Sequence, residues 1–464
     1  MGMMEDLRMA DTMALLDRAV AALRTQGRRQ RAYWEYYEGD QPLLYVTESV
    51  RNYFRSRARS QLRFVENWVS VVVASVLERI HLQALHHTNP KVDAVLQRLL
   101  AEGDVVGLSY DVHEQALATG EAYLIVWPSL TDMQQRMPRP FFQVPGSVVA
   151  LVDNEDATRM VAAAKWWKDS EGFVRLTLYT PEALYRYRSR ARAAGSDSGE
   201  DITDARAFAP YGTETAPAVE ANPTGRLPVV RFQTHKAAAT PEYLKAAPAQ
   251  DMLNKTLADQ MVTGEWGAFP QRYIVTNADL SQLESKPAGL WEIPAGVEGV
   301  EPTKVGQFDP ADLSNYTKVI EHFVAAIAAI SRVPSYYLRA GGETPSGEAL
   351  RLMDSVLVHR AKARMAAFAP AWKQVARLML AFEGVQADLA DLQVEFADPA
   401  VTFPDKVADA RAKNRQAGMP LTSILREEGK PEAFIRQVQD DLLEERQEAS
   451  LEAGLAQLLA GRAE

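Results

Sequence analysis

The sequence predicts an α+β protein that is mainly helical. Apolar residues recur at helical spacing from 62 to 73 and again from 313 to 330. Between these regions, the stretch 121–235 contains short runs of β-branched and aromatic residues separated by turns, which is typical of strands. A chain of 464 residues is too long for one ordinary core, so we expect about three domains.

The first element is helical and extends to about residue 80. The strands follow and are predicted in EAYLIVWPSL, FFQVPGSVVALVDN, MVAAAKWWKD, FVRLTLYTPEALYRYRS and LPVVRFQTH. Residues 194–225 are small, polar and rich in proline without any periodicity, so we expect a long exposed loop there. Residues 241–265 then return to helical spacing, and a small β-rich insert occupies 266–308.

The segment 309–332 gives the clearest helical signal of the chain. Asp309 suits an N-cap and Pro310 the first helical position, while Asp312 lies near the positive end of the helix. Six residues at spacings of three and four form a packing seam: Leu313, Tyr316, Ile320, Phe323, Ile327 and Ile330. Such a seam is typical of a bundle core or of a two-stranded coiled coil, and the sequence leaves both open.

A loop and a third long helix follow this segment. The loop, 333–346, contains two prolines and the pair Gly341-Gly342, and Thr344 or Ser346 can cap the next helix. That helix is predicted to end at about Phe382 with a kink at Pro370. A short strand comes next in VQADLADLQVEFADPA, and the rest of the chain is helical and heavily charged.

Composition excludes several classes of protein. Without cysteine there is no disulfide framework, no thiolate metal site and no cysteine nucleophile. A net charge of −10 argues against tight gripping of nucleic acid by the whole chain, although it permits a surface past which nucleic acid slides. The N-terminus has no signal-peptide pattern and the longest apolar runs are too short to span a bilayer, so we expect no membrane association.

No stretch carries the pattern of a catalytic or cofactor site. The glycine pair lacks the lysine of a phosphate-binding loop, and His113-Glu114 lacks the second histidine of a zincin helix. Acidic pairs such as Asp440-Asp441 lie in a charged helix, where a solvated face is the default interpretation. We therefore expect no enzyme, no metal and no cofactor.

Several motifs, in order, resemble the portal proteins of siphovirus-type tailed bacteriophages. They are NWVSVVVASVLERIHL at 67–82, ALATGEAYLIVW at 116–127, TGRLPVVRFQTH at 224–235, and ISRVPSYYL followed by SGEAL within 330–350. Each motif alone is weak, but their order and spacing together are fairly specific. The resemblance covers about 30 to 440.

The resemblance implies a portal fold with wing, stem, clip and crown. Its parts would be a wing at 1–240 with 345–382, stem helices at 241–265 and 309–332, a clip at 266–308, a tunnel loop at 333–346, and a crown at 385–464. The loop would enter the channel through Arg332, Arg339, Gly341, Gly342, Glu343, Thr344 and Ser346. The glycines would permit backbone conformations closed to other residues as a duplex passes.

The resemblance also implies a function and a set of partners. About twelve copies would form a homo-oligomeric ring at a capsid vertex, through which double-stranded DNA is packaged and ejected. The partners would be the terminase large subunit, the major capsid protein and the head-tail adaptor protein. The protein would be assembled in the host cytoplasm and reside in the virion. The alternatives are a minor capsid or scaffold protein without a channel, and a nucleic-acid-processing enzyme.

Overall fold

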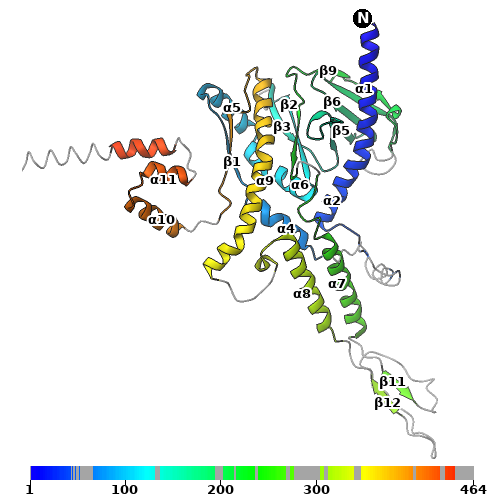
Figure 1. The fold of residues 1–464 in the computed structure, drawn as a ribbon. Coiled ribbons are helices and arrows are strands. Elements are labelled where there is room, and N and C mark those ends of the chain that lie inside the picture. Colours follow the sequence, from blue (N-terminus) through cyan, green and yellow to red (C-terminus); the bar gives the residue numbers. More distant parts are fainter. Residues whose placement is uncertain are drawn as a thin grey trace, which may run out of the picture. The chain divides into compact units, whose positions relative to one another are not determined.

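The computed structural model describes most of the chain. The described residues are 2–42, 66–130, 136–193, 202–213, 216–235, 239–267, 272–275, 304–307, 312–338, 346–400, 404–428 and 434–444, with residues 44, 48 and 52. They fall in two compact units, Met1–Pro399 and Ala400–Glu464. In the first unit, a long run of antiparallel strands lies between an N-terminal and a later helical region (Figure 1), so the fold is mixed α+β, as predicted.

The N-terminal helical region packs on a β-sheet. Three segments follow one another without a break: α1 (Gly2–Ala22), the π-helical turn η1 (Leu23–Gly27) and α2 (Arg28–Glu38). Gly39, with a left-handed φ of 81°, ends α2. Leu16, Val20 and Leu23 are buried against the sheet, because the apolar residues of this amphipathic stretch lie on one side.

That sheet is antiparallel and has six strands. In the order β4-β5-β6-β7-β8, with β9 also paired to β7, the strands are β4 (Val148–Val152), β5 (Met160–Lys168), β6 (Phe173–Tyr179), β7 (Ala183–Arg192), β8 (Phe208–Pro210) and β9 (Val219–Ala221). The exposed loop predicted at 194–225 is therefore partly wrong. It contains β8, β9 and the short helix η2 (Ala205–Ala207), and Ala205 and Phe208 are buried beneath α1. Strands of three residues, such as β8 and β9, are too short to show in the sequence the alternation of apolar and polar residues that identifies a strand.

A second sheet lies in the main core of the unit. Its order is β10-β2-β3, with β2 (Glu121–Leu130), β3 (Arg136–Phe142) and β10 (Val229–Gln233). Helices α4 (Trp68–Leu77), α6 (Val105–Thr119) and α9 (Gly347–Phe382) bury apolar residues in the same core as β2 and β10. The predicted strands at 121–130 and 227–235 are confirmed.

Two distant segments form a third, small sheet, of which the sequence predicted the second strand but neither the first strand nor the pairing. β1 (Leu82–His87) pairs antiparallel with β13 (Leu392–Phe396), and α5 (Pro90–Glu102) packs beside β1. The helix predicted to extend to about residue 80 ends at Leu77, where α4 stops and the chain turns into β1. The ladder partners of β1 lie more than 300 residues away, so local pattern gives no sign of the pairing.

A helix pair connects the core with a short hairpin. Helix α7 (Ala247–Gly267) lies beside α8 (Ser314–Ser331) (Figure 1), and Thr263 Oγ1 lies 3.1 Å from the Tyr316 hydroxyl. The hairpin consists of β11 (Arg272–Val275) and β12 (Lys304–Gln307). Helix α8 begins later than predicted. Asp312 accepts a hydrogen bond from the Ser314 amide at 2.9 Å, while Asp309 and Pro310 lie outside the described residues.

Helix α9 is continuous through Pro370 and begins at the predicted cap. The Ser346 hydroxyl accepts from the Ala349 amide at 3.3 Å, whereas Thr344 lies outside the described residues. In the second unit, α10 (Pro404–Gln416) and α11 (Leu421–Glu427) are joined by the ion pair Arg411–Glu428 at 2.6 Å. Among the described residues, no helix is long and apolar enough to cross a membrane.

Candidate functional site

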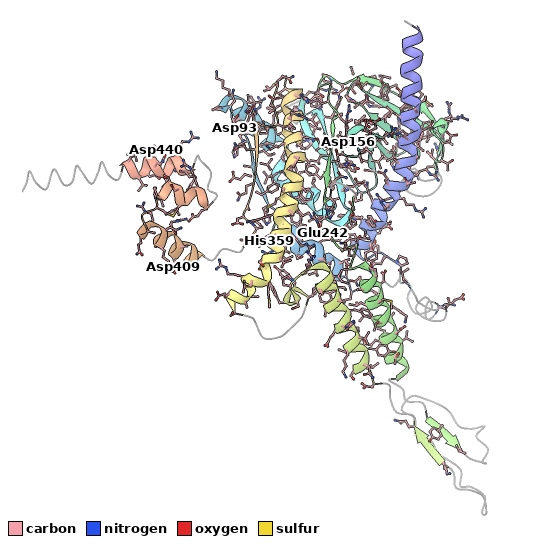
Figure 2. The ribbon with its side chains drawn as sticks, viewed as in Figure 1. Asp93, Asp156, Glu242, His359, Asp409 and Asp440 are labelled. Atoms are coloured by element: carbon pink, nitrogen blue, oxygen red, sulfur yellow. The ribbon has the colours of Figure 1, made fainter. Side chains whose placement is uncertain are left out.

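The helix pair α7–α8 meets α9 through a buried carboxylate. Glu242, which is labelled in Figure 2, is 4% exposed. It accepts hydrogen bonds from Arg360 Nη2 at 2.6 Å and from Arg364 Nε. The same arginines donate to backbone carbonyls: Arg360 to Ser331, the last residue of α8, and Arg364 to Thr234 at 2.7 Å. We call Glu242, Arg360 and Arg364 the Glu242 joint. It ties the start of α7, the end of α8 and the end of β10 to one face of α9.

In the Glu242 joint, one carboxylate and a carbonyl at the negative end of α8 together compensate two guanidinium charges. Burial alone would raise the pKa of Glu242, but the charges of Arg364 and Arg360 outweigh it, so the pKa lies below its ordinary value. Burial and the Arg364 charge lower the pKa of His235, which is therefore neutral at pH 7. The joint contains two guanidinium groups and one carboxylate, and the carbonyl at the negative end of α8 compensates the second cation.

A second polar cluster holds the segment that follows α8. Arg79 donates to the Tyr337 hydroxyl at 2.8 Å, to Asp354 of α9 at 3.0 Å and to the Pro399 carbonyl at 3.1 Å. Tyr336 donates to the other oxygen of Asp354. We call Arg79, Tyr336, Tyr337 and Asp354 the Arg79 joint. Because the Arg79 and Asp354 side chains are 9% and 12% exposed, this ion pair is largely shielded from solvent.

The Arg79 joint corrects one expectation about the predicted tunnel loop, 333–346. Val333 and Leu338 are 4% and 2% exposed, and residues Ser335–Tyr337 form the short helix η3. The first half of the predicted loop is thus packed on the core, because two apolar side chains and two tyrosine hydroxyls anchor it. Arg332 is exposed and ends α8 with a left-handed φ of 54°.

The remaining loop residues are not all described. Ser346 caps α9, as stated above, whereas five of the predicted loop residues lie outside the described residues: Arg339, Gly341, Gly342, Glu343 and Thr344. The structure therefore brings Arg332 and Ser346 to the two borders of the segment and leaves the role of its centre a prediction.

The packing seam predicted on α8 is only partly formed within the subunit. Ile327 is fully buried, and Ile320 and Phe323 are partly buried against the main core. Leu313 and Ile330, in contrast, are 36% and 45% exposed. These two side chains are only partly covered in the described part of the chain, whereas Val324 and Ala328 on the same helix are buried.

The base of α7 is fixed by side-chain amides. Gln250 accepts from the Trp68 amide at 3.0 Å and donates to the Glu66 carbonyl at 2.5 Å. Asn67 caps α4 by accepting from the Ser70 amide at 3.3 Å. The Asn-Trp motif at 67–68 thus has a structural cause: it starts α4 and attaches it to α7.

His113 is a core histidine and not a metal ligand. It accepts a hydrogen bond from Trp372 Nε1 at 2.9 Å and stacks on Phe368, and burial lowers its pKa to about 3. Its neighbour Glu114 accepts from the Tyr37 hydroxyl at 2.8 Å. Across the described part of the chain, no group of three or more potential ligands is placed to hold a metal ion.

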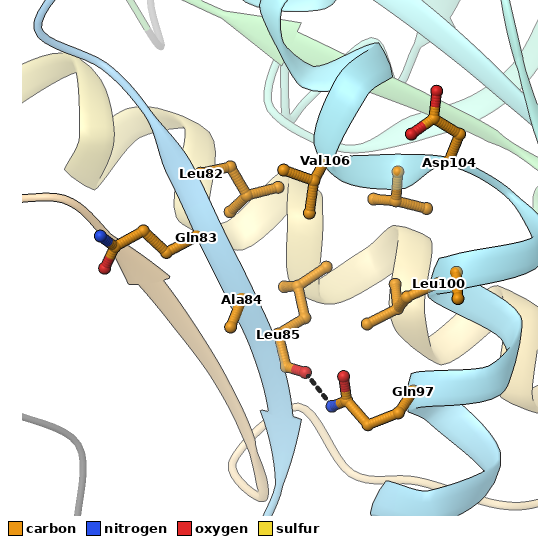
Figure 3. Close-up of a pocket in the computed structure, with 10 residues that line it drawn as sticks. Leu82, Gln83, Ala84, Leu85, Gln97, Leu100, Asp104 and Val106 are labelled. Atoms are coloured by element: carbon orange, nitrogen blue, oxygen red, sulfur yellow. Dashed lines mark hydrogen bonds between the residues drawn. The ribbon is translucent and has the colours of Figure 1, made fainter. Parts of the chain in front are cut away.

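A cavity of about 240 Å³ lies between β1, α5 and the start of α6 (Figure 3). Aliphatic side chains dominate its lining, and Gln97 donates its amide to the Leu85 carbonyl at 2.8 Å. Figure 3 shows the Asp104 carboxylate turned away from these aliphatic groups. The cavity therefore presents no set of groups that would perform acid–base or nucleophilic chemistry.

Sequence reasoning missed the charged residues of both joints. Arg360 and Arg364 are one helical turn apart and have the spacing of an ordinary solvated helix face. Their partner Glu242 is 118 residues distant from Arg360, which no local pattern reveals. Of these charged residues, only Arg79 belongs to a motif that the sequence analysis singled out, because it is the arginine of the Glu-Arg pair within 67–82.

A family model described as "Phage portal protein, SPP1 Gp6-like" matches residues 32–451. The chain belongs to this family. The resemblance deduced from the motifs is confirmed. In the structure, these motifs contain α4, the end of α6 with the start of β2, β10 and the segment around η3. Three of them supply Arg79, Thr234 and Tyr337 to the two joints.

Two curated relatives named "Portal protein" agree with the family. One, from Mycobacterium phage D29, is 29% identical over 114 residues, and the other, from Mycobacterium phage L5, is 27% identical over 114 residues. Each match spans 24% of this chain and 24% of the relative's own length. The function of the whole relatives is therefore applied to this chain only as a proposal.

Solved structures give a more distant likeness. A chain from "Neck of empty GTA particle computed with C6 symmetry" has a TM-score of 0.42 and 13% identity, covering 84% of this chain and 95% of that chain. A chain from "Virion of native gene transfer agent (GTA) particle" has a TM-score of 0.41 and 13% identity, covering 83% and 99%. These scores are low, and no inference rests on them.

Proposed function

We propose that about twelve copies of this chain close into a ring at a capsid vertex, and that double-stranded DNA passes through the ring during packaging and ejection. Family membership supports this proposal, and one structural observation carries it. Eight large apolar side chains are exposed on α7, α8 and the first half of α9: Met252, Met261, Leu313, Val319, Ile330, Leu352, Met353 and Val356. We call this set the apolar stem surface.

We expect a protein partner to cover the exposed side chains of the apolar stem surface. Leu352 is 72% exposed and Met261 45%, although both belong to helices whose other sides are well packed. Exposed apolar side chains that cluster, such as Leu352, Met353 and Val356 within five residues of α9, typically mark a protein–protein contact. A second copy in a ring supplies the same helices to its neighbour in a head-to-tail arrangement, which closes without leaving an unpaired end.

The dimensions of such a ring suit a duplex. A helix with its side chains is about 10 Å wide, so about twelve side by side form a circle of roughly 120 Å with a diameter of about 38 Å. Subtracting one helix width leaves a bore of roughly 28 Å. The net charge of −10 also fits a conduit, since a basic bore would release condensed counterions and hold DNA in place.

We assign the parts of the subunit on the basis of the family resemblance. The stem is α7 with α8, the clip includes the β11–β12 hairpin, the wing comprises 1–240 with most of α9, and the crown begins after 385. Residues 339–345 form the channel-facing part of the tunnel loop, held at one border by the Arg79 joint and at the other by the Ser346 cap. The terminase, the capsid protein and the head-tail adaptor are the proposed partners, and the chain acts without catalysis of its own.

Mass photometry of the purified full chain tests ring formation. Leu352→Glu places a charge in the apolar stem surface and should shift the particle from several hundred kilodaltons to the mass of the monomer. Val144→Glu is the matched control, because Val144 is 65% exposed in a loop between β3 and β4. A wild-type chain that remains monomeric at high concentration, or a Leu352→Glu variant that assembles normally, contradicts the proposal.

A packaging assay tests the loop separately from the ring. Replacing Gly341 and Gly342 with valine restricts the backbone while leaving the anchored half of the loop in place. We expect normal rings by mass photometry and reduced DNA packaging. Normal packaging by rings of this variant would remove the loop from the mechanism.

A further inference from the structure

One face of the six-stranded sheet changes character along its length. Its first half is apolar, where Val148, Ala163 and Tyr179 pack against β2 and β10. The second half continues on the same strands, with side chains of alternate positions on that face. Its members are Lys165, Trp167, Arg175, Arg186, Arg188 and Arg192, which we call the arginine face. The opposite face of the sheet is buried under α1.

The arginine face is held in shape by stacking. The guanidinium of Arg175 lies 3.7 Å from the centroid of the Tyr211 ring, and that of Arg188 lies 3.7 Å from the Phe173 ring and 5.1 Å from Tyr211. Rings and cations therefore alternate across three strands. Stacked guanidinium groups have lost side-chain freedom before any partner arrives, which lowers the entropic cost of binding.

These cations are not fully neutralised. Arg175 pairs with Asp169 at 2.6 Å, Arg186 with Glu220 at 2.5 Å and Arg188 with Glu171 at 2.9 Å. Within the described part of the chain, no ion pair involves Lys165 or Arg192, so five cations face three carboxylates, an excess of two. This excess occurs in a chain of net charge −10. Each paired arginine also keeps donors that its carboxylate does not use.

The distance between neighbouring cations on β7 matches the side-chain repeat of an extended peptide. Arg186 and Arg188 are two residues apart on β7, so their side chains are separated by about 6.8 Å along the strand. An extended peptide repeats the same distance between every second side chain. Strand β9 already provides an example within the chain: it is extended, lies beside β7 and brings Glu220 to Arg186.

A cavity completes the arginine face. It measures about 320 Å³, and its lining includes Trp167, Arg175, Arg186, Tyr211, the hydroxyl-bearing Thr177 and Thr213, and Asp169, whose carboxylate is paired with Arg175. Trp167 is 40% exposed beside it. A volume at the lower end of the range for small-ligand pockets accommodates a side chain of a bound peptide.

We propose that the arginine face is a docking site for an extended, acidic segment of a partner protein. Carboxylates on alternate residues of that segment pair with the remaining donors of Arg186, Arg188 and Arg192, which follow one another along β7, and one of its side chains enters the cavity beside Trp167. Carboxylate is the favoured anion, because three cations of the arginine face, Arg175, Arg186 and Arg188, already bind carboxylates in the subunit. The site belongs to one subunit and does not depend on the proposed ring.

Fluorescence anisotropy with the full-length protein tests this site. The probe is a short labelled peptide of alternating glutamate and threonine, at about 0.15 M salt, where unspecific attraction is screened. The double variant Lys165→Gln, Arg192→Gln removes the two cations without ion-pair partners, so the fold should keep its melting temperature. We expect its affinity to fall about tenfold, corresponding to about 1.4 kcal/mol. Arg159→Gln, whose side chain is 72% exposed near β4 and β5, is the control and should change affinity less than about twofold.

Three results would overturn the proposal. The first is a double variant that binds the alternating peptide as well as the wild type. The second is equal affinity for a peptide of the same composition with all glutamates in one block. The arginine face would then attract negative charge whatever the distance between the carboxylates. The third is tighter binding of a short single-stranded DNA than of the peptide, which would assign the face to phosphates. None of these results bears on whether rings form.

Discussion

Helix α9 contributes residues both to the two joints and to the apolar stem surface, and these regions satisfy their side chains in opposite ways. At the Glu242 joint, every charged group has partners inside the subunit, and the carboxylate is 4% exposed. On the apolar stem surface, large side chains are left exposed within the described chain, with 72% of Leu352 exposed. The first region makes the subunit stable by itself, and the second leaves its stabilisation to a neighbour.

This difference separates folding from assembly. Variants in the joints should change the free energy of unfolding of the subunit, whereas variants on the apolar stem surface should change the oligomeric state and leave the unfolding of the monomer nearly unaltered.

The largest effect is expected for Glu242→Ala. It leaves two buried guanidinium groups without their carboxylate, and removing one partner of a buried ion pair costs about 3–5 kcal/mol. Urea denaturation of the variant measures this loss. Glu171→Ala is the control, since Glu171 also pairs with an arginine but is 60% exposed, and it should cost less than about 1 kcal/mol. Equal losses in the two variants would show that burial of the joint is irrelevant.

Gly120→Ala should have the next largest effect. Gly120 has a φ of 89°, and a Cβ there would lie 2.3 Å from the Thr240 backbone nitrogen, which belongs to the chain entering the Glu242 joint. Left-handed strain adds about 1–2 kcal/mol, and the clash raises the total above that. Gly384→Ala isolates the strain, because Gly384 has a φ of 77° and nothing within 4 Å. Thermal unfolding should rank Gly120→Ala clearly below Gly384→Ala, and the reverse order would refute the close contact.

The pH dependence of unfolding should reveal His113. Burial lowers its native pKa to about 3, whereas an unfolded histidine titrates near 6.5. Below about pH 6.5, the His113 imidazole of the unfolded chain binds a proton, whereas the buried imidazole of the native state stays neutral. The free energy of unfolding therefore declines by about 1.4 kcal/mol per pH unit until about pH 3. The variant His113→Asn should lose less stability than the wild type over this range. If the unfolding free energies of both proteins fell equally with pH, this would contradict the assignment of His113 as a neutral core histidine.

The smallest effect on subunit stability is expected for Val319→Lys. Val319 is 43% exposed on α8, so its replacement removes little burial in the monomer, and the unfolding free energy should change by less than about 0.5 kcal/mol. Sedimentation velocity should nevertheless show loss of the large particle. A variant that unfolds much more easily than the wild type would mean that this surface is packed within the subunit.

The sequence predicted elements whose causes are local and missed those whose causes are distant. The cap Ser346 and the strand at 121–130 were found, because a hydroxyl before a helix and a run of β-branched residues act on their own neighbourhood. The pairing of β1 with β13 and the contact of Glu242 with α9 were not found, since each joins segments separated by more than 100 residues. Family motifs located the region of the candidate site, but not the charges that hold it together.

A single-particle reconstruction of the purified chain tests the central claim most directly. We expect a closed ring in which α7 and α8 of neighbouring subunits cover each other's exposed apolar side chains around a bore that admits a DNA duplex. An open filament, a dimer that covers the same helices, or a ring whose bore is too narrow for a duplex would contradict the account.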